Sequence, residues 1–310
     1  MIHRVQVFFF VLVLILTITS CMRHLSESDN LLIAVSIPPQ AWFVSQIAGD
    51  KAACLILVPP GQNPHNYEPT PRQLQSLSSA DAWILSGSEF EITLRPRIES
   101  LFPDILIIDG TLGVNFRLLE DHDHYDEEHD SNHHVSHNAL NSALNHSPLI
   151  IDRHTWLGLQ PALMLAEHIL KTLCLLDKDN DDYYLLNYKE TILQINLAFD
   201  KLKTDLAPLN GKSVFVYHPS FGYFFDEFGI IQEAVETGGK EPTPRQLNDL
   251  IEKITAEKPA AIFVQTQFPV NAARTIADTA GAAVIELDPL AEDWLSNIYY
   301  MGEALKALIK

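Results

Sequence analysis

The sequence has few cysteines and a shortage of basic residues. Of its 310 residues only 3 are cysteine, and 21 Lys and Arg stand against 40 Asp and Glu, for a formal net charge of −19. The acidic balance argues against nucleic acid or an anionic lipid surface as a partner, and it suits a protein that handles cations. Cys21, Cys54 and Cys174 are too few and too dispersed for a zinc site built from thiolates. Outside the cytoplasm Cys54 and Cys174 could form a disulfide, but the sequence does not decide whether they meet.

The N-terminus has the parts of a secretory signal. An unbroken apolar run, Val7 to Leu16, follows His3 and Arg4. The run is too short for a comfortable membrane span, which needs about 20 residues. Small residues then lead to Cys21. We therefore predict a cleaved signal over residues 1–20, and the alternative is an N-terminal anchor helix that is never cleaved.

The end of this signal has a specific pattern. The segment Ile18-Thr19-Ser20-Cys21 resembles the lipobox of bacterial lipoproteins. The resemblance implies that Cys21 is lipidated and becomes the first residue of the mature chain. Residues 21–30 would then form a tether that holds the protein to a membrane without spanning it.

Residues 31–180 are predicted to form a first α/β lobe. Apolar runs that do not alternate with polar residues are separated by segments with helical spacing. Such strands are typical of a parallel sheet that helices cover on both faces. The expected strands are Leu31–Val35, Ala53–Val58, Ala82–Leu85 and Ile105–Ile108, and the expected helices include Gln40–Ala48 and Pro71–Ala80, the second capped by Thr70.

A long helix is predicted to join this lobe to a second one. From Asp181 to Leu206 apolar residues recur at alternating steps of three and four, which is the spacing of one helix face. Roughly 26 residues at 1.5 Å each span about 39 Å, enough to run the height of two stacked lobes. Strand and helix patterns alternate again after Gly211. We expect a linking helix over residues 181–207 and a C-terminal α/β lobe over residues 208–310.

One short sequence occurs twice. Glu241–Leu247 repeats Glu68–Leu74 letter for letter. The same helix cap and first-turn proline could have been used twice, but seven identical residues favour related lobes. The predicted fold is therefore two α/β lobes with parallel-type sheets, joined by the long helix, with a site in the cleft between them.

The stretch from Glu120 to His146 is rich in histidine and acid. Almost nothing in it is apolar before Ala139, so it cannot bury enough surface to order itself, and we predict a mobile loop. Imidazole and carboxylate groups suit zinc, so the loop is predicted to hold weak auxiliary sites. A merely solvated acidic loop is the alternative. Its histidines are His122, His124, His129, His133, His134, His137 and His146.

Four metal-compatible side chains stand close behind apolar runs: His65, His154, His218 and Asp288. A single loop histidine is more often a surface or structural residue than a ligand. His65, however, lies among prolines that stiffen its loop, and the pattern recurs at four probable segment ends. Because ligands collect beyond the carboxyl ends of parallel strands, we expect the four groups to face one cleft. Three imidazoles and one carboxylate favour zinc, although manganese, cobalt or iron could fit.

The segments around these residues resemble the solute-binding lipoproteins of bacterial zinc and manganese ABC importers, and most of all their high-affinity zinc-uptake members. The segments are Asn63–Thr70, Asp152–Leu157, His218–Tyr223 and Leu287–Leu290. The resemblance covers nearly the whole mature chain, including the long helix and the histidine-rich loop, and it implies that the same four side chains are the metal ligands. Two positions depart from the family pattern: Arg153 stands where proline is common, and Gly158 where an acid is common.

The resemblance implies a carrier rather than an enzyme. Family members that carry manganese commonly have glutamate at the third ligand position, where this chain has His218, so zinc is favoured over manganese as the transported ion. The implied partners are an ABC permease with its ATPase, and a membrane reached through the lipid anchor. The implied location is extracytoplasmic, in the periplasm or on the cell surface of a bacterium.

Two other functions are weighed against carriage. A zinc hydrolase needs an open coordination position for water and a nearby general base. The sequence has no His-Glu-x-x-His pair, and four protein donors would close the coordination sphere, so this function is disfavoured. A metal-binding surface adhesin is suggested by similar families that are displayed on cells, and it is compatible with metal binding.

Overall fold

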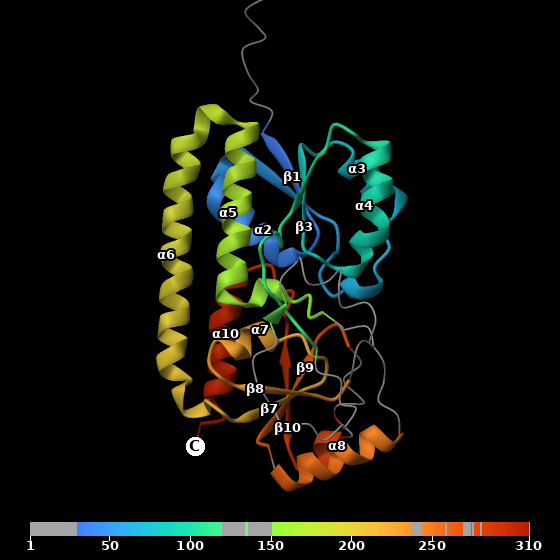
Figure 1. Cartoon of the computed structure of the whole chain (residues 1–310), viewed down its shortest axis with the longest axis vertical. Coiled ribbons are helices and arrows are strands. Elements are labelled where there is room, and N and C mark those ends of the chain that lie inside the picture. The colour runs from blue at the N-terminus through green and yellow to red at the C-terminus, as the bar shows by residue number, and fades with distance from the viewer. Residues whose placement is uncertain are drawn as a thin grey trace, which may run out of the picture.

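The computed structural model describes residues 30–119, 134–135, 151–236, 244–257, 259–268, 274, 276–279 and 281–309. Within these residues the chain forms two four-stranded parallel sheets, one in each half (Figure 1). The first has the order β2-β1-β3-β4 and the second β10-β9-β7-β8. The predicted α/β class with two parallel sheets is therefore confirmed.

The strands of the first sheet are close to the predicted ones. They are β1 (Leu31–Val35), β2 (Ala52–Ile56), β3 (Ala82–Leu85) and β4 (Leu106–Asp109). Ala34 of β1 pairs with Leu55 on one side and Trp83 on the other, so β1 and β3 lie inside the sheet. Every residue of β3 is buried, as a continuous apolar strand requires when both faces are covered.

The second sheet follows the same principle. Its strands are β7 (Ser213–Val216), β8 (Ile231–Ala234), β9 (Ala261–Gln265) and β10 (Ala283–Leu287). All five residues of β9 are buried, whereas the edge strand β10 has exposed positions. The carboxyl ends of β7 and β9 lead directly into the residues that form the candidate site.

The N-terminal helices confirm the capping prediction. They are α2 (Pro38–Ala48), α3 (Pro71–Leu77) and α4 (Glu89–Leu101). At the start of α3, Thr70 Oγ1 accepts a hydrogen bond from the Gln73 backbone N–H at 3.3 Å, and Gln73 Oε1 accepts one from the Thr70 N–H at 2.9 Å. The helix ends at Leu77, three residues before the predicted end at Ala80.

The long helix α6 (Asp181–Asp205) runs along both halves of the molecule (Figure 1). Its 25 residues span about 37 Å. The C-terminal helix α10 (Trp294–Lys306) packs against α6 and also returns to α2. The Trp294 ring lies 5.3 Å from that of Trp42 and 4.8 Å from that of Phe43, between centroids, so one apolar core continues from one half into the other. The predicted domain boundaries at residues 180 and 207 stay a prediction.

Helix α5 (Leu159–Leu176) is long and apolar enough to cross a membrane by length and composition. Its residues Leu165, Ala166, Ile169 and Leu173 are buried, and the helix packs against α2 and α6. One face of α5, amounting to 33% of its apolar window, is thus buried inside the molecule.

The remaining elements are short apart from α8. They are β5 (Phe116–Arg117), β6 (His134–Val135), α7 (Gly222–Asp226), α8 (Pro244–Glu257) and the 3₁₀ turns η2 (Gly49–Lys51), η3 (Pro64–Asn66), η4 (Thr155–Leu157), η5 (Lys178–Asn180) and η6 (Ala207–Leu209). Cys54 and Cys174, the cysteines within the described ranges, are both free thiols. The predicted signal, Cys21 with its tether, and the histidine-rich loop, apart from the backbone of His134 and Val135, lie outside the described residues.

Candidate metal centre

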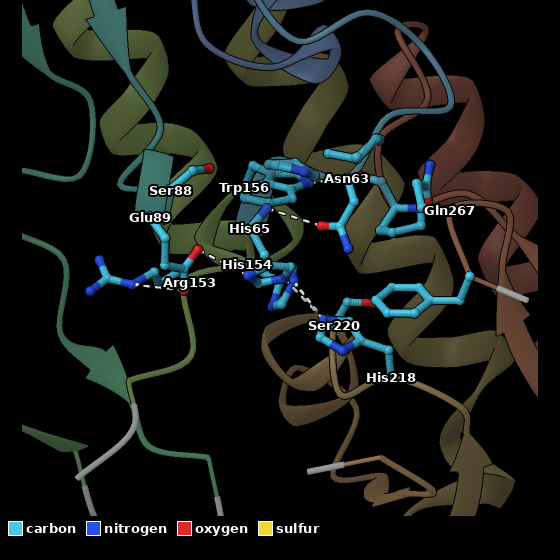
Figure 2. A pocket seen from close by; sticks show the side chains of 14 residues that line it. Asn63, His65, Ser88, Glu89, Arg153, His154, Trp156, His218, Ser220 and Gln267 are labelled. Atoms are coloured by element: carbon cyan, nitrogen blue, oxygen red, sulfur yellow. Dashed lines mark hydrogen bonds and ion pairs between the residues drawn. The ribbon is translucent and has the colours of Figure 1, made fainter. Parts of the chain in front are cut away.

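Three of the four predicted donors meet in one pocket, and each comes from a different segment. His65 lies in η3, His154 is the residue before η4, and His218 follows β7 by two positions. Figure 2 shows the three rings pointing toward one another. One ring nitrogen from each residue lies within 4.8 Å of the other two. The prediction that these histidines come together is therefore supported by their geometry.

The converging atoms are the Nε2 nitrogens. His65 Nε2 lies 3.1 Å from His218 Nε2, which lies 3.4 Å from His154 Nε2. Ligand nitrogens about 2.05 Å from a tetrahedral zinc ion are separated by about 3.3 Å. The spacing of the imidazoles therefore fits a single ion of this size, with His218 close to both partners.

The other nitrogen of each ring faces a carboxylate. The His65 ring faces Glu89, with Nδ1 and Oε2 2.9 Å apart. The corresponding distance is 2.8 Å from His154 Nδ1 to Asp152 Oδ1, and 2.7 Å from His218 Nδ1 to Glu236 Oε2. An ionised carboxylate only accepts hydrogen bonds, so each Nδ1 carries the proton and each Nε2 presents a lone pair. Three Nε2 atoms that face one another in this way can bind one cation together, so the arrangement fits a metal ion.

Burial lowers the pKa of His218. His218 is 3% exposed, and its burial, together with the nearby His154 and His65, lowers its pKa from 6.5 to about 4 despite the hydrogen bond with Glu236. The ring is therefore neutral at pH 7, as a metal ligand must be.

The two carboxyl groups on the N-terminal side remain ionised. Burial by itself would raise the pKa of Asp152, but the hydrogen bond from His154 and the charge of Arg117 bring that pKa below its usual value. Burial would also raise the pKa of Glu89, but the hydrogen bond from His65, together with the charge of Arg153, lowers it. Both carboxylates can thus accept hydrogen bonds from the imidazole Nδ1 atoms at neutral pH.

Two arginines hold these carboxylates in place. Arg117 Nη1 lies 3.4 Å from Asp152 Oδ2, and its Nε donates to Asp226 Oδ2 at 2.9 Å. Arg153 Nε lies 3.2 Å from Glu89 Oε1, and its Nη1 donates to the Gly87 carbonyl at 2.8 Å. Arg153 is one of the two residues that depart from the family pattern, and it connects the segment of His154 with Glu89, the carboxylate that faces His65.

Sequence reasoning did not find the three carboxylate partners. Asp152 carries a local signal, since it stands two residues before His154 and its Oδ1 also accepts from the His154 backbone N–H at 3.0 Å. Glu89 and Glu236 are 24 and 18 residues away from their histidines, and no spacing rule predicts such pairs.

The last residue of β9 and the loop after it hold His218 in place. Gln265 Oε1 accepts from the His218 backbone N–H at 3.1 Å, and Gln265 Nε2 donates to the His218 carbonyl. The Phe268 ring stacks on the His218 ring with centroids 4.5 Å apart. Trp156 lines the same pocket, and its Nε1 donates to the Pro289 carbonyl at 2.8 Å.

Asp288 lies outside the group of three imidazoles in this structure. Its Oδ1 accepts hydrogen bonds from Gln267 Nε2 at 2.7 Å and from the Leu290 backbone N–H at 2.9 Å. Its neighbours Pro289 and Leu290 do line the pocket. The role of Asp288 as the fourth ligand stays a prediction, as do the auxiliary sites in the histidine-rich loop.

The chain is similar to proteins of metal uptake. Residues 33–308 match the family described as zinc-uptake complex component A, periplasmic. The solved crystal structure of ZnuA is 31% identical, with a TM-score of 0.77 over 90% of this chain and 99% of that one. The zinc-binding lipoprotein AdcA of Streptococcus pneumoniae is 26% identical over 94% of this chain, which spans 58% of the length of AdcA.

A third relative carries a different description. The iron ABC transporter substrate-binding lipoprotein MtsA of Streptococcus pyogenes is 24% identical, over 87% of this chain and 83% of MtsA. The family match takes in both sheets, the long helix and all three converging histidines. The chain therefore belongs to the family of zinc-uptake complex component A, the periplasmic component.

Proposed function

We propose that this chain is the extracytoplasmic zinc-binding component of an ABC importer, which captures Zn²⁺ and delivers it to a membrane permease. The observation that carries the proposal is the convergence of three Nε2 atoms at the spacing of a tetrahedral ion. The carboxylate behind each ring orients its imidazole and strengthens it as a ligand.

The donor set supports zinc over manganese or iron. Three neutral imidazoles are borderline donors that suit zinc, whereas manganese sites are richer in carboxylate oxygen. The relatives do not agree on the metal, since AdcA is described as zinc-binding and MtsA as an iron-transporter component. The proposal of zinc therefore depends on the three imidazole nitrogens of this chain and not on the names of its relatives.

We propose Asp288 as the fourth ligand, which would close the coordination sphere. A closed sphere of four protein donors leaves no position for a reactive water, so it suits carriage rather than hydrolysis. The match to an uptake component also argues against an enzyme.

The location and partners follow from the same family. We propose that Cys21 anchors the protein to a membrane outside the cytoplasm, that an ABC permease with its ATPase receives the ion, and that the histidine-rich loop gathers zinc weakly near the site. The names of AdcA and MtsA, both lipoproteins, support this arrangement.

A competition titration of the mature, metal-free protein with zinc and with manganese tests the proposal. We expect one tight zinc site, weaker manganese binding, and no turnover of ester or peptide substrates by the zinc-loaded protein. His154→Ala removes a donor and should weaken zinc binding by a factor of 100 or more, while His168→Ala, a change on α5 outside the pocket, should leave it unchanged. Zinc affinity that survives His154→Ala, or metal-dependent hydrolysis, would overturn the proposal.

A further inference from the structure

The last residue of β9 and the loop that follows it connect the third predicted ligand with the fourth. On one side, Gln265 holds the backbone of His218 and Phe268 stacks on its ring. On the other side, Gln267 Nε2 donates to Asp288 Oδ1 at 2.7 Å. Gln267 is thus the point of this loop that contacts the carboxylate, and it also lines the pocket of the three histidines (Figure 2).

The backbone around Asp288 is held independently of Gln267. Asn297 Nδ2 donates to the Asp288 carbonyl at 2.7 Å, and Trp156 Nε1 donates to the Pro289 carbonyl at 2.8 Å. The backbone is therefore tied to α10 and to the second ligand loop. A movement of the Asp288 carboxylate toward the imidazoles therefore requires its side chain to leave Gln267 and to change its hydrogen bond with the Leu290 backbone N–H.

The amide of Gln267 has one satisfied end and one unsatisfied end. A carboxylate cannot donate, so the amide nitrogen must be the atom that faces Asp288, and the oxygen faces the opposite way. Gln267 Oε1 is buried and has no hydrogen-bond partner among the residues that the structure describes. While Gln267 holds Asp288, its own amide oxygen stays unpaired. This unpaired acceptor costs free energy, so the contact with Asp288 can be broken at little net cost.

We propose that Gln267 is a latch for the fourth ligand: its amide nitrogen holds the Asp288 carboxylate outside the group of imidazoles until a metal ion arrives. This inference rests on the proposed function, because it assumes that the three histidines receive the ion and that Asp288 completes the site.

Charge is the reason why the Asp288 carboxylate would leave Gln267 and bind the metal ion. Three neutral imidazoles leave the ion without an anion in direct contact, because the carboxylates behind the rings lie beyond the Nδ1 atoms. A carboxylate bound to the ion itself supplies that contact in a largely buried pocket. The ion attracts Asp288 far more strongly than a neutral amide does, so the carboxylate leaves Gln267 only when the histidines are loaded. Without metal, the latch keeps a carboxylate away from three lone pairs that it would only repel.

The test is a double-mutant cycle in the full mature protein, with zinc affinity measured by competition with a chromophoric chelator. Gln267→Leu removes the latch and keeps the side chain's volume, so zinc should bind about tenfold tighter, which is the size of one hydrogen bond to a charged group. Asp288→Asn should weaken binding. In the Asp288→Asn background, Gln267→Leu should have no effect, because the latch acts only through the carboxylate.

Several results would overturn the latch. Weaker zinc binding by Gln267→Leu would show that Gln267 keeps its contact with Asp288 in the loaded protein and orients the carboxylate. An unchanged affinity would show that Gln267 does not restrain the Asp288 carboxylate. The same change in both backgrounds would show an effect that bypasses Asp288. Gln267→Ala repeats the test if the leucine variant does not fold, and Gln46→Leu on the exposed face of α2 serves as the matched control.

The latch and the proposed function fail in different ways. If Asp288→Asn leaves zinc affinity unchanged while His154→Ala abolishes it, the latch is wrong and the histidine site holds. If His154→Ala also has no effect, the proposed function itself is wrong.

Discussion

The Nδ1 atom of His218 lies 2.7 Å from Oε2 of Glu236, and each of these side chains is 4% exposed. The pair is buried more deeply than the pair of His65 and Glu89, whose side chains are 29% and 39% exposed. Because Glu236 accepts a hydrogen bond from Nδ1, the His218 ring turns its Nε2 lone pair toward the other two rings. The orientation of the central imidazole thus depends on a carboxylate that takes no direct part in binding.

Glu236→Gln should weaken zinc binding by about tenfold, because outer partners of metal-bound histidines typically contribute tenfold or more to affinity. The amide keeps an acceptor for Nδ1 but removes the negative charge that makes the imidazole a stronger ligand. A competition titration measures the change, and Glu252→Gln, an exposed position on α8, is the control. Equal affinities for the two variants would contradict the assignment.

The metal-free protein should lose stability as the pH falls from about 6.5 to about 4. The pKa of His218 is about 4 in the folded protein and 6.5 ordinarily, so in this window the unfolded chain takes up a proton that the folded chain refuses. The stabilisation is complete above pH 6.5 and is lost toward pH 4. In His218→Asn the slope of unfolding free energy against pH should be shallower by up to about 1.4 kcal/mol per pH unit.

Urea unfolding of both proteins at several pH values, with a chelator present, measures this difference. The difference between the two slopes isolates the contribution of His218. Parallel curves would show that His218 is not held neutral by its surroundings.

Arg117→Met should destabilise the protein by about 3 kcal/mol or more. Asp152 is fully buried, and removing its cationic partner leaves a buried charge that only His154 and backbone groups compensate. Arg95→Met is the matched control, because Arg95 forms an exposed ion pair with Glu99 that contributes at most about 1 kcal/mol. Denaturant unfolding of the metal-free proteins separates the two, and a similar small loss in both would contradict the role of Arg117.

Deleting residues 120–146 should leave one tight zinc site and remove the weak ones. The three converging histidines lie outside this stretch, whereas the auxiliary donors lie within it. Isothermal titration of the mature protein with and without the stretch measures both classes of site. Loss of the tight site on deletion would show that the histidine-rich stretch takes part in it.

The amino-acid sequence was enough to predict the class of fold and the three histidines that converge. Unalternating apolar runs such as Ala82–Leu85 must be covered on both faces, so they predicted parallel strands, and the three and four spacing of Asp181–Leu206 predicted α6 to within one residue. His65, His154 and His218 could be chosen because each stands just beyond an apolar run in a distinctive local segment. These features depend only on residues that are neighbours in the sequence, so they can be recognised without a structure.

The tertiary structure alone decided which groups stand behind and beside those donors. Glu89, Glu236 and Arg117 reach the site across long stretches of chain, and an acid on a helix or after a strand looks the same in sequence whether it meets an imidazole or water. The contact of Asp288 with Gln267 is likewise a matter of two loops placed side by side by β9 and β10. Such contacts depend on where folded segments end up relative to one another, and the packing of the whole core sets that placement.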